Sequence, residues 1–594
     1  MSVSLPSWRS IVGYEEEEDW VLSKMRTGYP RFFIHLIIQE LEQEILSRYG
    51  QDNEKTMLFP SSATASRCMR FLLDKEQSLT SKNVHMVNLI PRALGNDIDQ
   101  DRQNVMSGLV CVLFPRGYLK LAKQVWQHSG DGISSRRGEF CLKALQEGLL
   151  YRKGDKTLPK QQQGRTCKGP RRYQNRETLN GTEHSHNDAS IQQLSLNTPV
   201  QEGKEYSQFV EERFGRNLNA ALAAKAKLAI RRRIAGCLTE DAELDKALEV
   251  SDDGSSHRVS GLSEDHVYLY PAGMSSIFNT HRMLMANRAE PRKSICFGFP
   301  YIDTLKILEK WGSGCLFYGH GSECDLDELE RRLEHGERYL ALFTEFPGNP
   351  LLNTPNLKRI RSLADMYDFA LVVDETIGNF INVNALSQAD VVVSSLTKVF
   401  SGDSNVMGGS AVYNPHGRMY QSLKRTLDIE YEDNYWGEDA VFMERNSRDF
   451  MSRIERVNFN AEAMADVLHS SPLVKQVYYP KYRSSKIYYD ECRNANGGYG
   501  GLLSVTFRHI EEAVVFFDAL EVQKGPSLGT NFTLSCPFVI LAHYNELDWA
   551  AQFGVDADLV RISVGLENTA DLKAIFERAL NSAEKLGLSR KTTA

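Results

Sequence analysis

Short apolar runs alternate with amphipathic stretches between residues 267 and 413, and several of these runs end in polar residues. The clearest run is the three valines at 391–393, which continue into the sequence SSLTK and end at Lys398. A continuous β-branched run of this kind is typical of a strand buried on both faces of a parallel sheet. The alternation therefore predicts an α/β region built around such a sheet.

Lys398 follows this predicted strand at its carboxyl end, where parallel sheets place their ligand sites. A lysine amine in this position can form a Schiff base with a phosphorylated aldehyde cofactor. The hydroxyls of Ser395 and Thr397 can hold the phosphate oxygens of that cofactor. The S-x-T-K pattern is weak by itself, because a surface lysine after a core strand would give the same sequence.

Two upstream strands strengthen this interpretation. The run 370–373 ends at Asp374, about 24 positions before Lys398, which is a common length for one βαβ step. An aspartate there can pair with a protonated pyridine nitrogen and keep the ring electron-withdrawing, although a helix N-cap or a surface acid gives the same pattern. The run 340–343 leads into a Pro/Gly/Asn turn, in which Asn349 can hydrogen-bond a ring hydroxyl.

A glycine turn follows a fourth predicted strand, residues 267–270. The backbone N–H groups of Gly273 and Met274 would face an anion from a helix N-terminus. An ordinary tight turn is the alternative, since this segment carries neither a GxGxxG nor a Walker A pattern.

Arg561 lies inside an apolar run near the C-terminus, residues 559–564. Arginine is rarely buried without a partner, so this residue either grips a substrate carboxylate or forms a structural ion pair. Ser527 lies in a glycine loop, residues 525–529, and can assist the same carboxylate.

Length and composition indicate a large enzyme of two to four domains, with 594 residues and 42% hydrophobic residues. The net charge of −7 gives no indication of nucleic-acid or membrane binding. The sequence contains no run of 18 apolar residues, so no membrane span is predicted, and the N-terminus shows no secretory signal. The ten cysteines are scattered without a CxxC pair, which favours a reducing, cytoplasmic compartment and argues against a structural metal site.

The pattern divides the chain into an N-terminal extension domain, a flexible linker, a large α/β domain and a smaller α+β domain, at 1–150, 151–205, 206–413 and 414–594. In the first segment the spacing predicts a helix over 34–45 and a strand over 108–114. The linker is polar, with almost no large apolar residues. Its basic start could contact RNA or a membrane, but a solvated linker is the preferred interpretation.

These motifs in combination resemble the PLP-dependent Cys/Met-metabolism (transsulfuration) family, and within it the fungal cystathionine γ-synthases. The motifs are Gly273-Met274, Tyr301, Asn349-Pro350, Asp374, 395–398, 527–529 and 561–567, with the sequences LPSW, GYEE and GYPRFFIH near the N-terminus. The resemblance implies a type I, aspartate-aminotransferase-like fold, with a large doubly wound PLP-binding domain and a smaller C-terminal α+β domain. It also implies a homodimer or homotetramer.

The resemblance further implies a role for each motif residue. Lys398 would carry the cofactor, pyridoxal 5′-phosphate (PLP), and move protons, Asp374 would hold the pyridine nitrogen, and Tyr301 would stack on the ring. The phosphate would be held by Gly273, Met274, Ser395 and Thr397. The ring hydroxyl and the substrate carboxylate would be fixed by Asn349, Ser527 and Arg561.

The resemblance has three departures from the family pattern. The family takes a Tyr-x-Arg phosphate contact from the neighbouring subunit; here Arg216 keeps the charge, but Phe214 replaces the tyrosine. A degenerate upstream copy of this order places Arg31 in the equivalent position, and Arg216 is preferred because the first copy lacks the glycine. Glu375 stands where family members usually have asparagine.

The reaction implied is PLP-dependent γ-replacement on an O-acylated homoserine, an amino-acid substrate. Cystathionine γ-synthase, which joins O-acetyl- or O-succinylhomoserine to L-cysteine, is the favoured member of this class. A carbon nucleophile in a specialised-metabolite pathway, a homoserine sulfhydrylase and a γ-lyase are the alternatives, because the sequence fixes neither the nucleophile nor the leaving group. A non-catalytic scaffold is disfavoured by the intact set of Lys398, Asp374 and Arg561.

Overall fold

The computed structural model describes residues 5–25, 33–91, 108–155, 220–238, 240–249, 256 and 258–593, with side chains described up to 585. Met1–Lys153 and Ala220–Ala594 form one compact unit. The predicted linker lies almost entirely outside the described residues.

A seven-stranded sheet forms the centre of this unit, in the order β5-β11-β10-β9-β8-β6-β7. Its strands are β5 (Val267–Tyr270), β6 (Ser294–Phe297), β7 (Cys315–Tyr318), β8 (Ala341–Glu345), β9 (Ala370–Asp374), β10 (Val391–Ser395) and β11 (Gly409–Tyr413). The pairs of β10 with β9, β9 with β8, and β6 with its neighbours are parallel, and β11 runs antiparallel to both β10 and β5. The predicted parallel sheet is confirmed.

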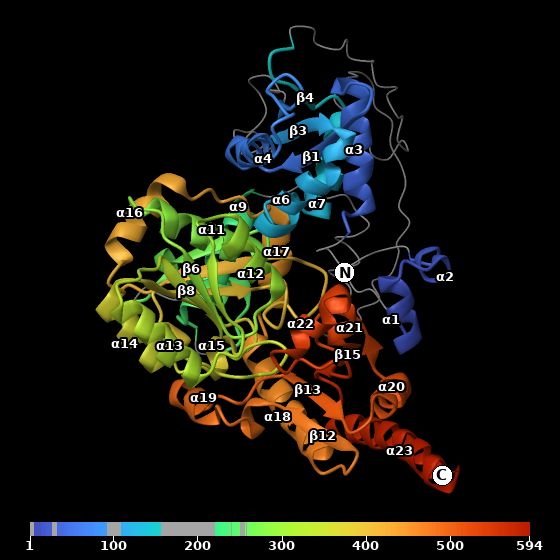
Figure 1. Ribbon diagram of the computed structural model, residues 1–594. Coiled ribbons are helices and arrows are strands. Elements are labelled where there is room, and N and C mark those ends of the chain that lie inside the picture. Colours follow the sequence, from blue (N-terminus) through green and yellow to red (C-terminus); the bar gives the residue numbers. More distant parts are fainter. Residues whose placement is uncertain are drawn as a thin grey trace, which may run out of the picture. The chain divides into compact units, whose positions relative to one another are not determined.

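Helices cover both faces of this sheet, because successive residues of each strand contribute to two separate apolar cores (Figure 1). Leu371 and Val373 face one core, and Ala370 and Val372 face the other. The first core includes residues of α9 (Ala220–Ala235), α13 (Glu323–Glu334), α14 (Leu357–Tyr367) and α17 (Gly437–Asn446). The second includes residues of α11 (Gly273–Ala286), α12 (Ile302–Lys310) and α16 (Tyr420–Glu430). The sheet is therefore doubly wound.

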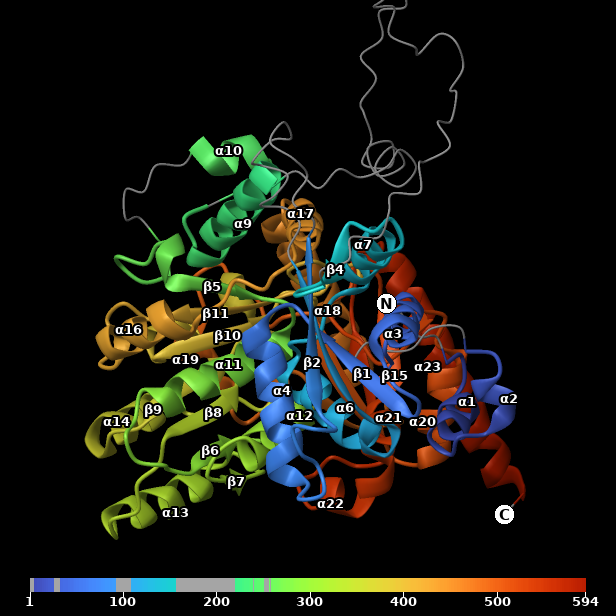
Figure 2. The same cartoon turned by 90° about the horizontal axis from the view of Figure 1, so that it is seen from above.

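The large-domain core extends past residue 413. Leu423 and Leu427 of α16 and Phe442 of α17 are buried against the central sheet's two faces. Helix α17 lies beside α9, which comes from the opposite end of the domain's sequence (Figure 2).

A second, five-stranded sheet follows the long helix α18 (Phe450–His469), in the order β12-β13-β16-β15-β14. Its strands are β12 (Val474–Tyr478), β13 (Leu502–Phe507), β14 (Gln523–Lys524), β15 (Leu534–Pro537) and β16 (Val560–Ser563). All pairs are antiparallel except β14 with β15. Its apolar core includes residues of α18, α20 (Ile510–Ala519) and α23 (Thr569–Thr593). The short helices α15 (Asn379–Asn382) and α19 (Lys486–Cys492) contribute to the first core of the central sheet, whereas α21 (Phe538–His543) and α22 (Leu547–Ala551) contribute to the core of the second sheet.

The N-terminal region has a four-stranded antiparallel sheet in the order β1-β3-β2-β4, with its own apolar core. Its elements are α3 (Leu36–Tyr49), β1 (Glu54–Phe59), α4 (Ser62–Lys75), β2 (His85–Pro91), β3 (Leu109–Pro115), α6 (Leu119–Ser129), α7 (Ser135–Gln146) and β4 (Leu150–Arg152). Helix α1 (Trp8–Glu15) instead joins the core of the second sheet, where Trp8 packs edge-on against Phe517. Two short helices, α2 (Asp19–Leu22) and α10 (Leu244–Glu249), complete the described α-helices.

Among the described helices, none combines the length and apolarity needed to cross a membrane. The nine cysteines within the described ranges are free thiols.

Candidate active site

The carboxyl ends of β8, β9 and β10 lie side by side and bring the predicted polar residues to one edge of the sheet. Glu345 pairs in register with Asp374, and Asp374 pairs with Val393 of the next strand. The Ser395 N–H donates to the Thr376 hydroxyl at 2.8 Å, which joins the segment after β9 to the end of β10. Lys398 follows in the turn beyond β10.

Lys398 meets a loop of the second sheet's domain. Its Nζ donates to the Ser527 hydroxyl at 3.1 Å, although the two residues are 129 positions apart. Gly529 has a φ of +69°, and a Cβ there would lie 2.4 Å from the Val399 nitrogen. Only glycine fits both the left-handed conformation and this close approach. The glycine loop therefore packs directly against the segment that carries Lys398.

Arg561 is buried on β16, and its guanidinium contacts the same glycine loop. Its Nη1 donates to the Asn349 side-chain oxygen at 3.0 Å, and its Nη2 donates to the carbonyls of Pro526 and Ser527. These acceptors are all neutral, and no described carboxylate lies within ion-pair distance of the guanidinium. The arrangement differs from a structural ion pair and suits the capture of an external carboxylate.

Asp374 is an acid without a cationic partner among the described side chains. One carboxylate oxygen accepts the Thr376 N–H at 2.8 Å. Burial raises the pKa of this carboxyl, and the hydrogen bonds from Thr376 oppose the rise. A protonated ring nitrogen placed beside it would stabilise the ionised form.

Glu375 is paired with an arginine and cannot hold the ring nitrogen. Both of its oxygens accept from Nη2 of Arg258, at 2.8 and 2.9 Å, and the two side chains are only 2% and 1% exposed. Arg258 also donates to the Ile234 carbonyl and lies 5.0 Å from the Phe380 ring. An arginine 117 positions upstream thus accounts for the acid where the family usually has asparagine.

The start of α11 has the features expected of the predicted phosphate site. Ala272 precedes the helix and offers no side-chain cap, whereas α13 is capped by Ser322, whose hydroxyl accepts the Asp325 N–H. A Cβ at Gly273 would lie 2.6 Å from the Ser395 Cβ, so the uncapped N-terminus and the Ser395 side chain are in close contact. Uncapped helix N–H groups beside a hydroxyl suit a phosphate.

Two further predicted residues have backbone or loop contacts. The Thr397 hydroxyl accepts the Gly408 N–H at 3.2 Å, which fixes the turn before Lys398. Tyr301 precedes α12, and its N–H donates to a Glu345 carboxylate oxygen at 2.5 Å. Arg216 and Arg31 lie outside the described residues, so the phosphate contact from a neighbouring subunit stays a prediction.

Glu345 and Arg258 were not identified from the sequence. Glu345 ends β8 just as Asp374 ends β9, so the strand-end pattern contained a signal for it. Arg258 gave no signal, because its partner is set by a contact between segments far apart in the chain.

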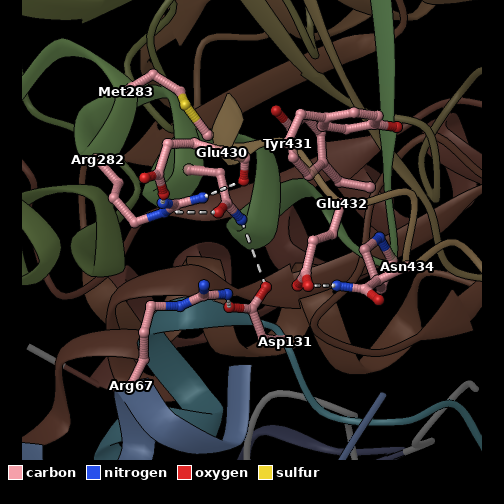
Figure 3. A pocket seen from close by; sticks show the side chains of 11 residues that line it. Arg67, Asp131, Arg282, Met283, Glu430, Tyr431, Glu432 and Asn434 are labelled. Atoms are coloured by element: carbon pink, nitrogen blue, oxygen red, sulfur yellow. Dashed lines mark hydrogen bonds and ion pairs between the residues drawn. The ribbon is translucent and has the colours of Figure 1, made fainter. Parts of the chain in front are cut away.

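A pocket lies next to α11 but contains none of the predicted site residues (Figure 3). Four of its charged side chains form two ion pairs, Arg67 with Asp131 at 2.9 Å and Arg282 with Glu430 at 2.5 Å, whereas Glu432 accepts from the Ser61 hydroxyl and the Asn434 amide. The neighbouring Ser275 hydroxyl donates to the Gly130 carbonyl at 2.6 Å, which links the N-terminal region to the first turn of α11. The charged side chains of this pocket thus have partners within the protein.

Comparison with known proteins decides the family. The family model described as "Cys/Met metabolism PLP-dependent enzyme" matches residues 258–581. The chain belongs to this family. A second model, "Fungal trans-sulfuration enzyme, N-terminal domain", matches residues 37–134 of this family member. The predicted cofactor, PLP, and the predicted type I fold of PLP-dependent enzymes are thereby confirmed.

Named relatives cover almost the whole chain of this Cys/Met-metabolism enzyme. It is 50% identical to a "Cystathionine gamma-synthase" of Neurospora crassa, over 98% of this chain and 96% of that protein. It is 40% identical to a "Cystathionine gamma-synthase-like enzyme" of Amanita muscaria, over 98% of this chain and 95% of that one. A crystal structure of cystathionine gamma synthase from Xanthomonas oryzae, in complex with cystathionine, is 20% identical, with a TM-score of 0.48 over 61% of this chain and 98% of the other.

The residues present fit the family's cofactor. The uncapped α11 N-terminus and Ser395 match a phosphate, and Asp374 matches a protonated ring nitrogen. The Lys398 amine is suited to form a Schiff base with the aldehyde carbon. Its hydrogen bond to Ser527 places the amine between the two domains. These four features lie on adjoining segments of one sheet edge.

Proposed function

We propose that this protein is a cystathionine γ-synthase, which joins an O-acylated homoserine to L-cysteine. The observation that carries the proposal is the contact of Lys398 with Ser527, next to Arg561, at the strand ends that bear Asp374. One site thus combines an amine for proton transfer, an acid for a ring nitrogen and a guanidinium for a carboxylate. The 50% identical relative named cystathionine gamma-synthase supports the choice within the class.

In this reaction the Cγ–O bond of the acylated homoserine breaks and a Cγ–S bond to cysteine forms. Bound PLP would supply an electron sink for the substrate carbanion. Lys398 would remove the proton at Cα and transfer protons at Cβ, since its amine lies at the strand ends beside the Ser527 hydroxyl. Asp374 would stay ionised against the ring nitrogen proton.

Substrate orientation would come from Arg561. Its guanidinium would exchange the neutral acceptors of the 525–529 loop for the substrate α-carboxylate, in a bidentate contact. Asn349 would remain beside it, because its side-chain oxygen accepts from Nη1, whereas the loop carbonyls accept from Nη2. Tyr301 would stack on the cofactor ring from the start of α12. Gly273, Met274, Ser395 and Thr397 would hold the phosphate.

We further propose a cytoplasmic homodimer or homotetramer, in which Arg216 of one subunit contacts the cofactor phosphate of its neighbour. Amino acids are the substrates, and no role with nucleic acid or membranes is proposed.

The test is a substrate panel with the purified, PLP-loaded protein. O-Acetylhomoserine and O-succinylhomoserine are each offered with cysteine, with sulfide or with a β-keto acid, and products are identified by mass spectrometry. We expect cystathionine as the main product. Faster conversion with sulfide or the β-keto acid would assign a different nucleophile, and no conversion of either ester would contradict γ-replacement.

A further inference from the structure

Glu345 is a buried carboxylate at the end of β8 that bonds to two separate loops. Its Oε1 accepts the Tyr301 N–H at 2.5 Å, and its Oε2 accepts the Asn349 N–H at 2.8 Å. Tyr301 belongs to the turn between β6 and α12, whereas Asn349 belongs to the turn after β8. One side chain therefore ties together the loops of the proposed ring-stacking and ring-hydroxyl residues.

The network extends to the substrate side of the site. Asn349 receives the Glu345 contact through its backbone and the Arg561 contact through its side chain, at 3.0 Å. A shift of the Asn349 backbone would therefore also move an acceptor of the guanidinium that is proposed to hold the substrate carboxylate.

The chemistry of this position requires a carboxylate. Backbone N–H groups only donate, so the side chain between them must accept on both of its ends. Glutamine has the same shape but accepts on one end only, and its NH₂ would face a second donor. Burial, and next the nearby Asp374, raise the pKa of Glu345, and the two backbone hydrogen bonds oppose this rise because they favour the ionised form.

We propose that Glu345 is a positioning residue that fixes the Tyr301 and Asn349 loops relative to each other, and so sets the orientation of the cofactor ring and of Arg561. This inference rests on the proposed function, because it assumes that the ring lies between these loops. Glu345 itself does not touch the reacting atoms.

The test compares Glu345→Gln with a matched control, Thr344→Val. Thr344 precedes Glu345 on β8, is also buried, and donates its hydroxyl proton to the Phe297 carbonyl at 2.8 Å. The control removes one buried hydrogen bond from the same strand without touching either loop. Each variant is loaded with PLP, and the visible circular dichroism of the bound cofactor, KM, kcat and the thermal midpoint are measured.

For Glu345→Gln we expect altered visible circular dichroism and a KM for the acylated homoserine raised about 10- to 150-fold, the range for losing a hydrogen bond to a charged group. Thr344→Val should keep the wild-type dichroism and KM at a lower thermal midpoint. Wild-type dichroism and KM in Glu345→Gln, or equal changes in both variants, would overturn the proposal.

A further variant keeps the test decisive if Glu345→Gln does not fold. Glu345→Asp retains the charge but is one methylene shorter, so it reaches only one of the two loops and should show the same change in dichroism. Wild-type dichroism in this variant would overturn the proposal. The dichroism does not depend on turnover, so a protein that makes no cystathionine but shows the change would contradict the proposed function alone.

Discussion

Asp374 and Glu375 are neighbours in the sequence, yet the structure gives them different partners. Successive strand residues point to opposite faces, so Asp374 reaches the site and Glu375 reaches Arg258 on the other face. Asp374 has no cationic partner among the described side chains, whereas Glu375 forms a buried ion pair. Removal of Asp374 should therefore lower activity, and removal of Glu375 should lower stability.

Replacement of Asp374 with alanine should lower kcat by about 100- to 1,000-fold, the usual effect of removing one electrostatic partner from an active site. PLP should still bind, because the phosphate contacts at α11 are untouched. Steady-state kinetics and the visible spectrum check this expectation. Activity within about twofold of wild type would show that another acid holds the ring nitrogen.

Replacement of Glu375 with glutamine should instead destabilise the fold. It leaves the buried Arg258 charge without its partner, which typically costs about 3–5 kcal/mol. Thermal unfolding should show the loss, and the double variant with Arg258→Leu should recover part of it. An unchanged midpoint in the single variant would mean that the ion pair contributes nothing.

The sequence predicts site residues where their position along the chain alone carries the information. Lys398, Asp374 and Asn349 follow apolar runs, and any parallel sheet collects such strand ends at one edge. It did not identify Arg258, because a side-chain partner 117 positions away depends on tertiary packing. It also did not single out Glu345, which follows the same strand-end pattern but whose two backbone contacts depend on the tertiary fold.

At the scale of elements, the strands were the most predictable part. The runs at 267–270, 370–373 and 391–393 correspond to β5, β9 and β10, with boundaries that differ by two residues at most. Strands buried on both faces have continuous apolar sequences that are easy to recognise. The packing of α16 and α17 into the large-domain core, past residue 413, was not predicted, because an amphipathic helix does not reveal which sheet it covers.

The loop at Gly529 provides a prediction at this scale. Gly529→Ala should weaken PLP binding and raise KM, because its methyl group would collide with the Val399 nitrogen and displace the loop that carries Ser527. Gly554→Ala is the matched control, since Gly554 also has a positive φ, +75°, but no atom within 4 Å of its ideal Cβ. Each variant should lose about 1–3 kcal/mol of stability from strain. If PLP titration gives the same affinity for both variants, the loop does not support the lysine.

At the scale of the whole molecule, the composition of one segment differs from that of the rest of the chain. Residues 160–200 contain too few large apolar residues to offset the entropy of ordering. Deleting them should leave the thermal midpoint and kcat unchanged within experimental error. Insoluble protein, or a midpoint lowered by several degrees, would show that this tract contributes to packing.

The most direct test of the central claim is to locate the lysine that carries the cofactor. The PLP-loaded protein is reduced with borohydride, digested and mapped by mass spectrometry. The account predicts a single pyridoxyl-modified lysine, Lys398, and no modification in the Lys398→Ala variant. A pyridoxyl group on any other lysine, or an unmodified chain after reduction, would contradict it.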